Sequence, residues 1–338
     1  LQSKKSFIYD KNNILIQTQK NITDNILYNI NYKKLILKSL ILIVSSIFNL
    51  ILYRWWNVIF FKDALEAICF DCSKVNFAEK YFFIYTSNIY KPLWTYHVES
   101  KKSKVEMLTI SSLTELDHIE KNNTEDYEGL SASTWKNFTV WNEGSKNYLK
   151  KRIIDKNINI NVLNSQIYYK DNNINIDIPG RSVAVFTYEN HRFNLTHSFL
   201  TDWVTSYTSD LHELNKFFWN DLIQMRNKYN FSLYVKKKRN FPKNFGYKKN
   251  LRFYDDLIDK NKVIEINNNI AIEKILKSVD LSVSMPFTSP SIVAKYMNKK
   301  SIYYDPTKLI NINDPNSSGI EIISGHDMLN QYFSQIFK

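Results

Sequence analysis

The segment between residues 279 and 306 brings hydroxyl groups to a turn between two apolar stretches. The stretch VDLSVSM predicts a buried strand that ends at Met285, after which the chain turns. Thr288 and Ser289 then precede Pro290, and proline is favoured at the start of helices, so Ser289 is expected to be the N-cap. The predicted helix therefore begins at the carboxyl end of the strand.

A helix that begins there could bind an anion without a glycine-rich loop. The free N–H groups of the first turn, the helix dipole and the hydroxyls of Thr288, Ser289 and Ser291 would converge on a phosphate. The alternative is ordinary capping, in which Ser289 serves only its own helix. The next predicted strand ends in Tyr304 and Asp305, which would bring an aromatic ring and a carboxylate to the same edge.

A basic segment, residues 234–252, follows another predicted strand and contains no acidic residue. Lys236 and Lys238 share one face of the strand, and with Arg239 they could neutralise a nucleotide phosphate or a sugar carboxylate. The alternative is a solvated basic loop. Nucleic-acid binding is not expected, because strands alternate with helices on either side of the segment.

The catalytic candidates lie on loops and helix starts. Glu189 and His191 follow the first strand of the second half of the chain, where a base or a cation could act on a leaving phosphate. In the first half, His97 and Glu143 are candidate bases for an attacking hydroxyl. Each could equally be a solvated side chain.

Three residues of the first half are candidates for binding an acceptor sugar. Asn88 follows a predicted strand, and Trp94 and Trp141 could stack on sugar rings. The alternative for the tryptophans is a place in the core. No D-x-D pair and no other metal-binding spacing is present, so we expect no metal.

The elements that must position these residues alternate between strand and helix. The predicted strands are 81–88, 104–112, 137–144, 182–190, 231–239, 262–267, 281–285 and 300–305. The predicted helices include 89–102, 211–229, 254–260, 271–280 and 290–299, and 113–134 is expected to be a loop. This alternation indicates an α/β fold with helices on a parallel sheet. We predict two domains, 1–160 and 182–338, joined by a linker, 161–181.

Residues 34–69 contain an apolar run that is short for a bilayer-spanning segment. We expect a buried or half-buried helix of the first domain. The alternatives are an interfacial helix, with Lys33, Lys34, Lys38 and Arg54 near lipid headgroups, and a spanning helix. The opening sequence LQSKKSFIYD is unlike a signal peptide, so we expect a cytoplasmic protein, with the interfacial helix implying peripheral contact with the inner membrane.

Composition excludes several classes of protein. The 338 residues include only 6 glycines, all isolated, so neither the dinucleotide fingerprint nor the P-loop is present. Aromatic residues make up 15% of the chain, which supports a sizeable core and argues against disorder. The net charge of +12 favours anionic partners.

Several of these segments resemble the bacterial polysaccharide-biosynthesis proteins known as the PFTS-motif family. The resemblance rests on P-F-T-S between a strand and a helix, followed by a strand ending in Y-Y-D-P. The segments KPLWTYHVES, WKNFTVWNEGSKNYL and FSLYVKKKRN are also similar to that family. Together they extend over roughly residues 80–306.

The resemblance implies a glycosyltransferase of the GT-B type, with two Rossmann-like domains facing a central cleft. It is similar in outline to bacterial sialyltransferases and capsule Kdo transferases, so the implied donor is a CMP-linked nonulosonic acid with its phosphate on Thr288 and Ser289. The implied acceptor is a glycan or a lipid-linked oligosaccharide of capsule or O-antigen, with no further cofactor. The alternatives are a non-catalytic, membrane-associated partner of a polysaccharide assembly complex and a transferase of a phosphate-linked group.

Overall fold

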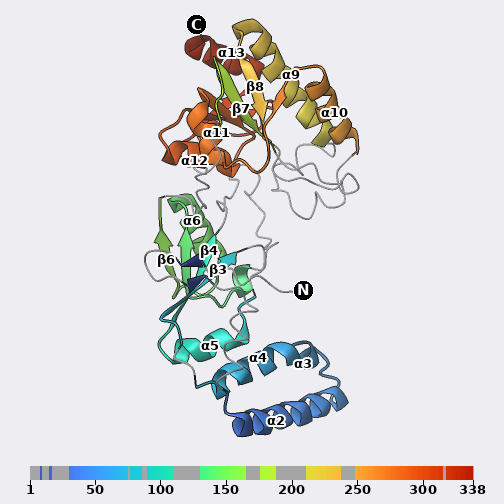
Figure 1. Ribbon diagram of the computed structural model, residues 1–338, viewed down its shortest axis with the longest axis vertical. Coiled ribbons are helices and arrows are strands. Elements are labelled where there is room, and N and C mark those ends of the chain that lie inside the picture. Colours follow the sequence, from blue (N-terminus) through green and yellow to red (C-terminus); the bar gives the residue numbers. More distant parts are fainter. Residues whose placement is uncertain are drawn as a thin grey trace. The chain divides into compact units, whose positions relative to one another are not determined.

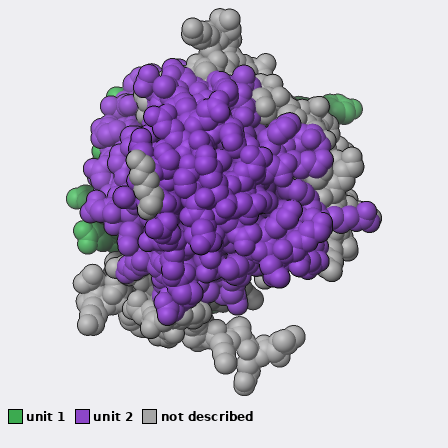
Figure 2. All heavy atoms as spheres, turned by 90° about the horizontal axis from the view of Figure 1, so that it is seen from above, with its two compact units in different colours: residues 1–108, 133–138, 157–159 green, residues 109–132, 139–156, 160–338 purple. Residues whose placement is uncertain are grey.

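The computed structural model describes residues 8–9, 15–16, 30–74, 77–85, 90–109, 130–164, 176–187, 211–236, 248–314 and 317–337. The chain forms two compact units that are not separated by a single cut in the sequence (Figure 2). Unit 1 comprises residues 1–108, 133–138 and 157–159, and unit 2 comprises the rest. The predicted division into domains 1–160 and 182–338 stays a prediction.

Unit 1 contains a group of helices near the start of the chain (Figure 1). They are α2 (Tyr32–Ile51), α3 (Trp56–Ile59), α4 (Phe61–Cys72) and α5 (Leu93–Ser100). The short strands β1 (Ile8–Tyr9) and β2 (Leu15–Ile16) pair antiparallel. Helix α2 contacts α3 and α4, and α4 contacts α5.

A four-stranded sheet has the order β3-β4-β5-β6. Its strands are β3 (Lys80–Tyr85), β4 (Lys104–Thr109), β5 (Asn137–Val140) and β6 (Asn159–Val162). Between β5 and β6 runs α6 (Glu143–Arg152), which is capped by the side chain of Asn142. The 3-10 turn η1 (Leu130–Ala132) precedes β5.

Unit 2 contains a six-stranded sheet of the order β12-β11-β10-β7-β8-β9, in which every neighbouring pair is parallel. The strands are β7 (Ser182–Phe186), β8 (Ser232–Val235), β9 (Ile264–Glu265), β10 (Leu281–Ser284), β11 (Ser301–Asp305) and β12 (Glu321–Ser324). Numbered from β7, this is the doubly wound order 3-2-1-4-5-6. The order reverses between β7 and β10, which we call the crossover point.

Helices cover both faces of this sheet (Figure 1). They are α9 (Leu211–Tyr229), α10 (Lys248–Asp259), α11 (Ile272–Ser278), α12 (Ser289–Tyr296) and α13 (Gly325–Ile336). Neighbouring residues of β11 distinguish the faces, because successive side chains of a strand point to opposite sides. Tyr303 bonds to the turn before α12, whereas Tyr304 bonds to Asp221 of α9. Therefore α9 and α12 lie on opposite faces.

The core of unit 2 is built from these strands and helices. Residues such as Val183, Val185, Leu281 and Val283 are almost fully buried, as expected for strands covered on both faces. The predicted α/β fold with a parallel sheet is confirmed. The 19-residue helix α9 has the bounds that helical spacing of its apolar residues predicts.

The prediction of a buried or half-buried core helix within residues 34–69 is wrong for α2. None of its residues is buried, and most of its apolar side chains are exposed. The apolar run predicts a core helix, but only one stripe of α2 packs against the rest of the protein, and that stripe is half-buried at most. The interfacial and spanning interpretations remain.

Candidate functional site

The turn between β10 and α12 has a constrained backbone. Met285 accepts hydrogen bonds through its carbonyl oxygen from the Thr288 amide at 3.4 Å and from the Thr288 hydroxyl at 2.8 Å. Phe287 has a φ of 61°, in the left-handed region that is unfavourable for a residue with a side chain. Its buried ring packs 5.7 Å from that of Tyr303, between ring centroids, which holds the turn in place. Strain of this kind is concentrated at functional sites.

The turn positions the N-terminus of α12 at the carboxyl edge of the sheet. Thr288, and not Ser289 as predicted, is the N-cap, and Ser289 is the first helical residue. The reason lies in the backbone, since Thr288 is still extended, with φ −83° and ψ 143°, whereas Ser289 already belongs to the helix. The Thr288 hydroxyl donates to Met285 within the turn and makes no capping bond to the helix. The first N–H groups of α12 therefore have no cap from this side chain, and they favour an anion.

Ser284 is the second feature of this edge. It is the last residue of β10, it is 0% exposed, and its hydroxyl has no hydrogen-bond partner among the described residues. The strand register pairs it with Tyr303, whose hydroxyl bonds to Thr288, so Ser284 lies on the α12 face of the sheet. A buried unpaired hydroxyl is uncommon in folded proteins, and a bound ligand is one way to satisfy it.

Lys236 lies in the same row across the sheet. It directly follows β8, where the register aligns Tyr234 with Ala184 of β7 and, through it, with Ser282 of β10. Two residues further on, Lys236 aligns with Phe186 and Ser284. Strands lie about 4.8 Å apart, so the Lys236 and Ser284 backbones are separated by about 10 Å. Burial lowers the pKa of Lys236. A phosphate at this position would offset the desolvation of its ammonium group.

Two of the predicted donor-binding residues are used inside the protein. Ser291 is fully buried, and its hydroxyl bonds to Ser301 at 2.8 Å and to the Ile302 carbonyl at 3.4 Å. The Asp305 carboxylate is also fully buried, and it accepts bonds from the amides of Thr307 and Ile310, both at 2.9 Å, and from the Thr307 hydroxyl. We therefore remove both residues from the candidate site.

Tyr304 is likewise fully buried and points away from α12. Its hydroxyl donates to Asp221 of α9, and the other oxygen of Asp221 lies 3.1 Å from Nδ1 of His326, at the start of α13. Burial, and then the Asp221 carboxylate, raise the pKa of Tyr304 far above its usual range. This chain of three side chains joins β11 to two helices on the α9 face, and no local sequence pattern predicted it.

Glu143 is the first residue of α6, and its side chain is 61% exposed. Its carboxylate pairs with Lys146, with a shortest distance of 2.9 Å between Oε2 and Nζ. The preceding Asn142 donates from Nδ2 to the hydroxyl of Ser318 at 3.1 Å. Within unit 2, Glu143 is therefore presented to solvent by a helix start that is fixed to the segment before β12.

His97, the second candidate base, lies on α5 in unit 1. Its Nδ1 is 3.6 Å from Oδ1 of Asp71, which also pairs with Lys34 and Lys38. Burial lowers the pKa of His97, although the Asp71 carboxylate opposes the shift. The ring is edge-on to Phe77, with 5.6 Å between centroids. These contacts join α5 to α2, to α4 and to the segment before β3, all within unit 1.

The two tryptophans proposed for sugar stacking belong to the core. Trp94 is 3% exposed and stacks on Phe70 with 4.3 Å between ring centroids. Trp141 is 0% exposed and donates from Nε1 to the Thr109 carbonyl at 2.7 Å. Neither ring has a face available to a sugar, so the acceptor-binding prediction is wrong for both.

Five predicted site residues lie outside the described residues: Asn88, Glu189, His191, Lys238 and Arg239. The candidate site is therefore built without these five residues. Within the described ranges, no group of three His, Cys, Asp or Glu side chains could hold a metal ion.

Unit 2 thus has the architecture of a doubly wound α/β protein, and its unusual polar groups gather at the crossover point, where such folds bind ligands. The chain belongs to the family described as polysaccharide biosynthesis PFTS motif proteins, whose model matches residues 38–333. The predicted resemblance to this family is confirmed. No curated protein matches the chain.

Solved structures give distant similarities. The UDP-GlcNAc 2-epimerase from Methanocaldococcus jannaschii is 13% identical, with a TM-score of 0.42 over 77% of this chain and 70% of that one. The glycotransferase of kitacinnamycin is 8% identical, with a TM-score of 0.44 over 82% of this chain and 71% of that one. Both TM-scores are below 0.5, so these similarities carry no argument here. The family is assigned from the family match, and the fold of unit 2 from its sheet order.

Proposed function

We propose that this protein is a GT-B glycosyltransferase of surface polysaccharide biosynthesis, and that its donor is a nucleotide sugar. The more specific proposal is a CMP-linked nonulosonic acid, transferred to a glycan or lipid-linked acceptor without a metal. Family membership supports the pathway. The observation that carries the donor site is the buried hydroxyl of Ser284, which has no partner in the described part of the chain, beside the N-terminus of α12 at the crossover point.

The chemistry of transfer makes this edge suitable for the donor phosphate. When the sugar–phosphate bond breaks, negative charge develops on the departing nucleotide. The uncapped N–H groups of α12, the Ser284 and Ser289 hydroxyls and the Lys236 ammonium group would stabilise that charge without reorganising. The strained turn at Phe287 would keep these groups in position before the donor arrives.

The attacking hydroxyl of the acceptor needs a base. We propose Glu143, because its carboxylate is exposed and Lys146 keeps it oriented at the start of α6. His97 is the alternative, since its imidazole can accept a proton and burial, which lowers its pKa, favours the neutral form. The two candidates are separable by replacing each with glutamine, which keeps a polar side chain but cannot act as a base: Glu143→Gln and His97→Gln.

The first experiment is a thermal-shift screen of the full chain with CMP, UDP and GDP, followed by hydrolysis assays with the corresponding nucleotide sugars. We expect CMP to raise Tm and the other nucleotides to have little effect. Ser289→Ala and Lys236→Met should each weaken CMP binding by about tenfold, the loss of one charge-assisted or close hydrogen bond. Matched controls are Ser334→Ala on α13 and Lys260→Met, which removes an exposed lysine paired with Asp256.

The outcomes separate the candidate functions. If no nucleotide shifts Tm and no donor is hydrolysed, the enzyme proposal fails and a non-catalytic partner of an assembly complex becomes the better explanation. If CMP binds equally well to Ser289→Ala, Lys236→Met and the controls, the site is wrong although the class stands. If the product carries the phosphate of the donor, the protein transfers a phosphate-linked group instead.

A further inference from the structure

Helix α2 has its polar and apolar sides reversed relative to an ordinary surface helix. Its half-buried residues recur every three or four positions and so form one stripe along the helix. That stripe is the more polar one, and its members are Leu35, Lys38, Ser39, Leu42, Ser46 and Asn49. Because α2 contacts α4, this polar stripe is the side that faces the protein.

Ion pairs fix α2 against α4 in this orientation. Lys34 lies 3.1 Å from Oδ2 of Asp71, near the end of α4, and Lys38 bonds to the same oxygen. Inside α2, Ser46 donates to the Leu42 carbonyl and Asn49 to the Ser45 carbonyl, so these polar groups are satisfied within the helix. The start of α2 is therefore held at the end of α4, and the two helices run antiparallel side by side (Figure 1).

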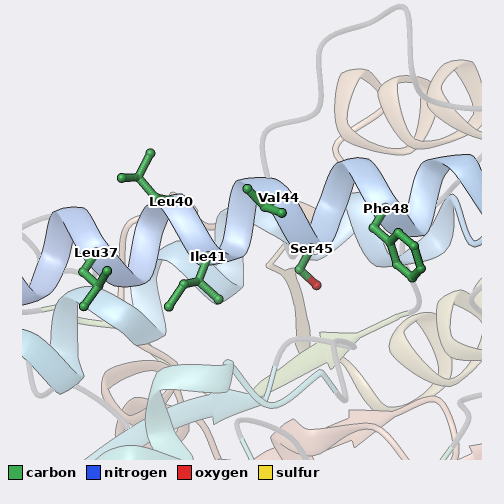
Figure 3. A pocket seen from close by; sticks show the side chains of 6 residues that line it. All are labelled: Leu37, Leu40, Ile41, Val44, Ser45 and Phe48. Atoms are coloured by element: carbon green, nitrogen blue, oxygen red, sulfur yellow. The ribbon is translucent and has the colours of Figure 1, made fainter.

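The opposite side of α2 is a continuous apolar surface. Figure 3 shows Leu37, Leu40, Ile41, Val44, Ser45 and Phe48 along successive turns of the helix, where they line an open groove. Ile41 is 61% exposed and Val44 is 66% exposed. The exposed apolar residues continue from Ile51, the last residue of the helix, to Trp55 and Ile59 beyond it. Exposed apolar surfaces of this extent mark contact with a membrane or with another protein.

Charge distinguishes a lipid surface from a protein partner. From Tyr32 to Lys62 the sequence contains no acidic residue. Its cations are concentrated at the ends of the apolar helix: Lys33, Lys34, Lys38, Arg54 and Lys62. Trp55, 61% exposed, and Tyr53, 87% exposed, follow the helix at the point where aromatic residues lie between lipid tails and headgroups. This arrangement matches an anionic phospholipid surface.

We propose that α2 and the residues through Phe60 bind the surface of an anionic phospholipid bilayer, with α2 lying in the plane of the membrane. The 20-residue helix is long and apolar enough to cross a bilayer by length and composition. Its antiparallel pairing with α4 argues against crossing, because α4 would enter the bilayer together with Lys62, Asp63, Glu66 and Asp71. In the plane, the polar stripe and α4 stay on the water side.

The test is flotation of the full chain with vesicles of phosphatidylcholine alone or with 30% phosphatidylglycerol. We expect binding to the anionic vesicles that weakens with added salt. The double variant Ile41→Asp and Val44→Asp should reduce binding at least tenfold. The matched control, Ile154→Asp with Leu309→Asp, changes two exposed apolar residues elsewhere and should bind as the parent does.

Three results would overturn the proposal. The first is equal binding of the double variant and the parent. The second is an absence of vesicle binding together with a dimer in sedimentation that the double variant dissolves, which would make a second copy the occupant of this surface. The third concerns topology: with protein added outside sealed vesicles, trypsin should cleave at the lysines that precede α2, whereas protection of those sites would indicate a spanning helix.

Discussion

The hydroxyl of Tyr303 donates a hydrogen bond to the carbonyl oxygen of Thr288 at 3.2 Å. This bond joins the Y-Y-D-P end of β11 to the P-F-T-S turn before α12, so the two segments that carry the resemblance to the family are linked directly. Phe287 packs on the same tyrosine ring.

Replacing Tyr303 with Phe should destabilise the protein by about 1 kcal/mol, because one buried hydrogen bond is lost and the ring contact is kept. For a domain of this size the expected fall in Tm is about 2–4 °C. Nucleotide affinity should also fall, since the turn that carries α12 is held less firmly. Tyr332→Phe is the control, because no hydrogen bond of its hydroxyl is present in the described part of the chain. Calorimetry that gives the same Tm for both variants would contradict the prediction.

Ser284→Ala should have opposite effects on stability and binding. Without a ligand, the change removes a buried hydroxyl for which the described residues provide no partner, so Tm should stay the same or rise by about 2–4 °C, corresponding to about 1 kcal/mol. With CMP present, the shift in Tm should be smaller than that of the parent protein. A structural serine would instead show a lower Tm and an unchanged response to CMP.

Asp305→Ala should lower stability without changing nucleotide affinity. The carboxylate accepts three hydrogen bonds in the loop after β11. Its loss leaves those donors unpaired, which should lower the free energy of unfolding by about 2–3 kcal/mol. Urea unfolding measures the change in stability. Titration with CMP, at a temperature below the unfolding transition, measures the nucleotide affinity. A large fall in affinity with unchanged stability would return Asp305 to the donor site.

Stability should fall as the pH drops below about 6.5, the usual pKa of histidine in an unfolded chain. Burial lowers the pKa of His97, so between that folded value and about 6.5 the unfolded chain binds the extra proton and unfolding is favoured. The groups that face the ring are Asp71, Lys34, Lys38 and Lys101. Urea unfolding at pH 7.5 and 5.5 should show a smaller difference for His97→Gln than for the parent. An identical difference would assign the pH dependence to other groups.

The sequence predicted most elements of unit 2 because its strands are short apolar runs between helices with helical spacing. Strand 281–285 and helix 290–299 were predicted within a few residues of β10 and α12. The turn at Pro286 and Phe287 was also predicted, and the structure adds the positive φ that no residue type alone indicated. The apolar stretch LSVSM contains two serines, which marks buried hydroxyls within a strand. The sequence does not show whether either hydroxyl has a hydrogen-bond partner.

What the sequence determined by itself is local: the periodicity that builds strands and helices, the proline that starts α12, and the family to which the P-F-T-S motif belongs. The tertiary structure decided which polar groups are free. Ser291 and Ser284 are both serines among apolar residues, and the sequence does not distinguish them. Ser301 of the neighbouring strand makes a hydrogen bond with the Ser291 hydroxyl, whereas no described residue makes one with the Ser284 hydroxyl. In the same way, Asp71 selects which stripe of α2 faces the protein and leaves the apolar side exposed. Pairing is set by elements far apart in the chain, so local sequence patterns could not specify it.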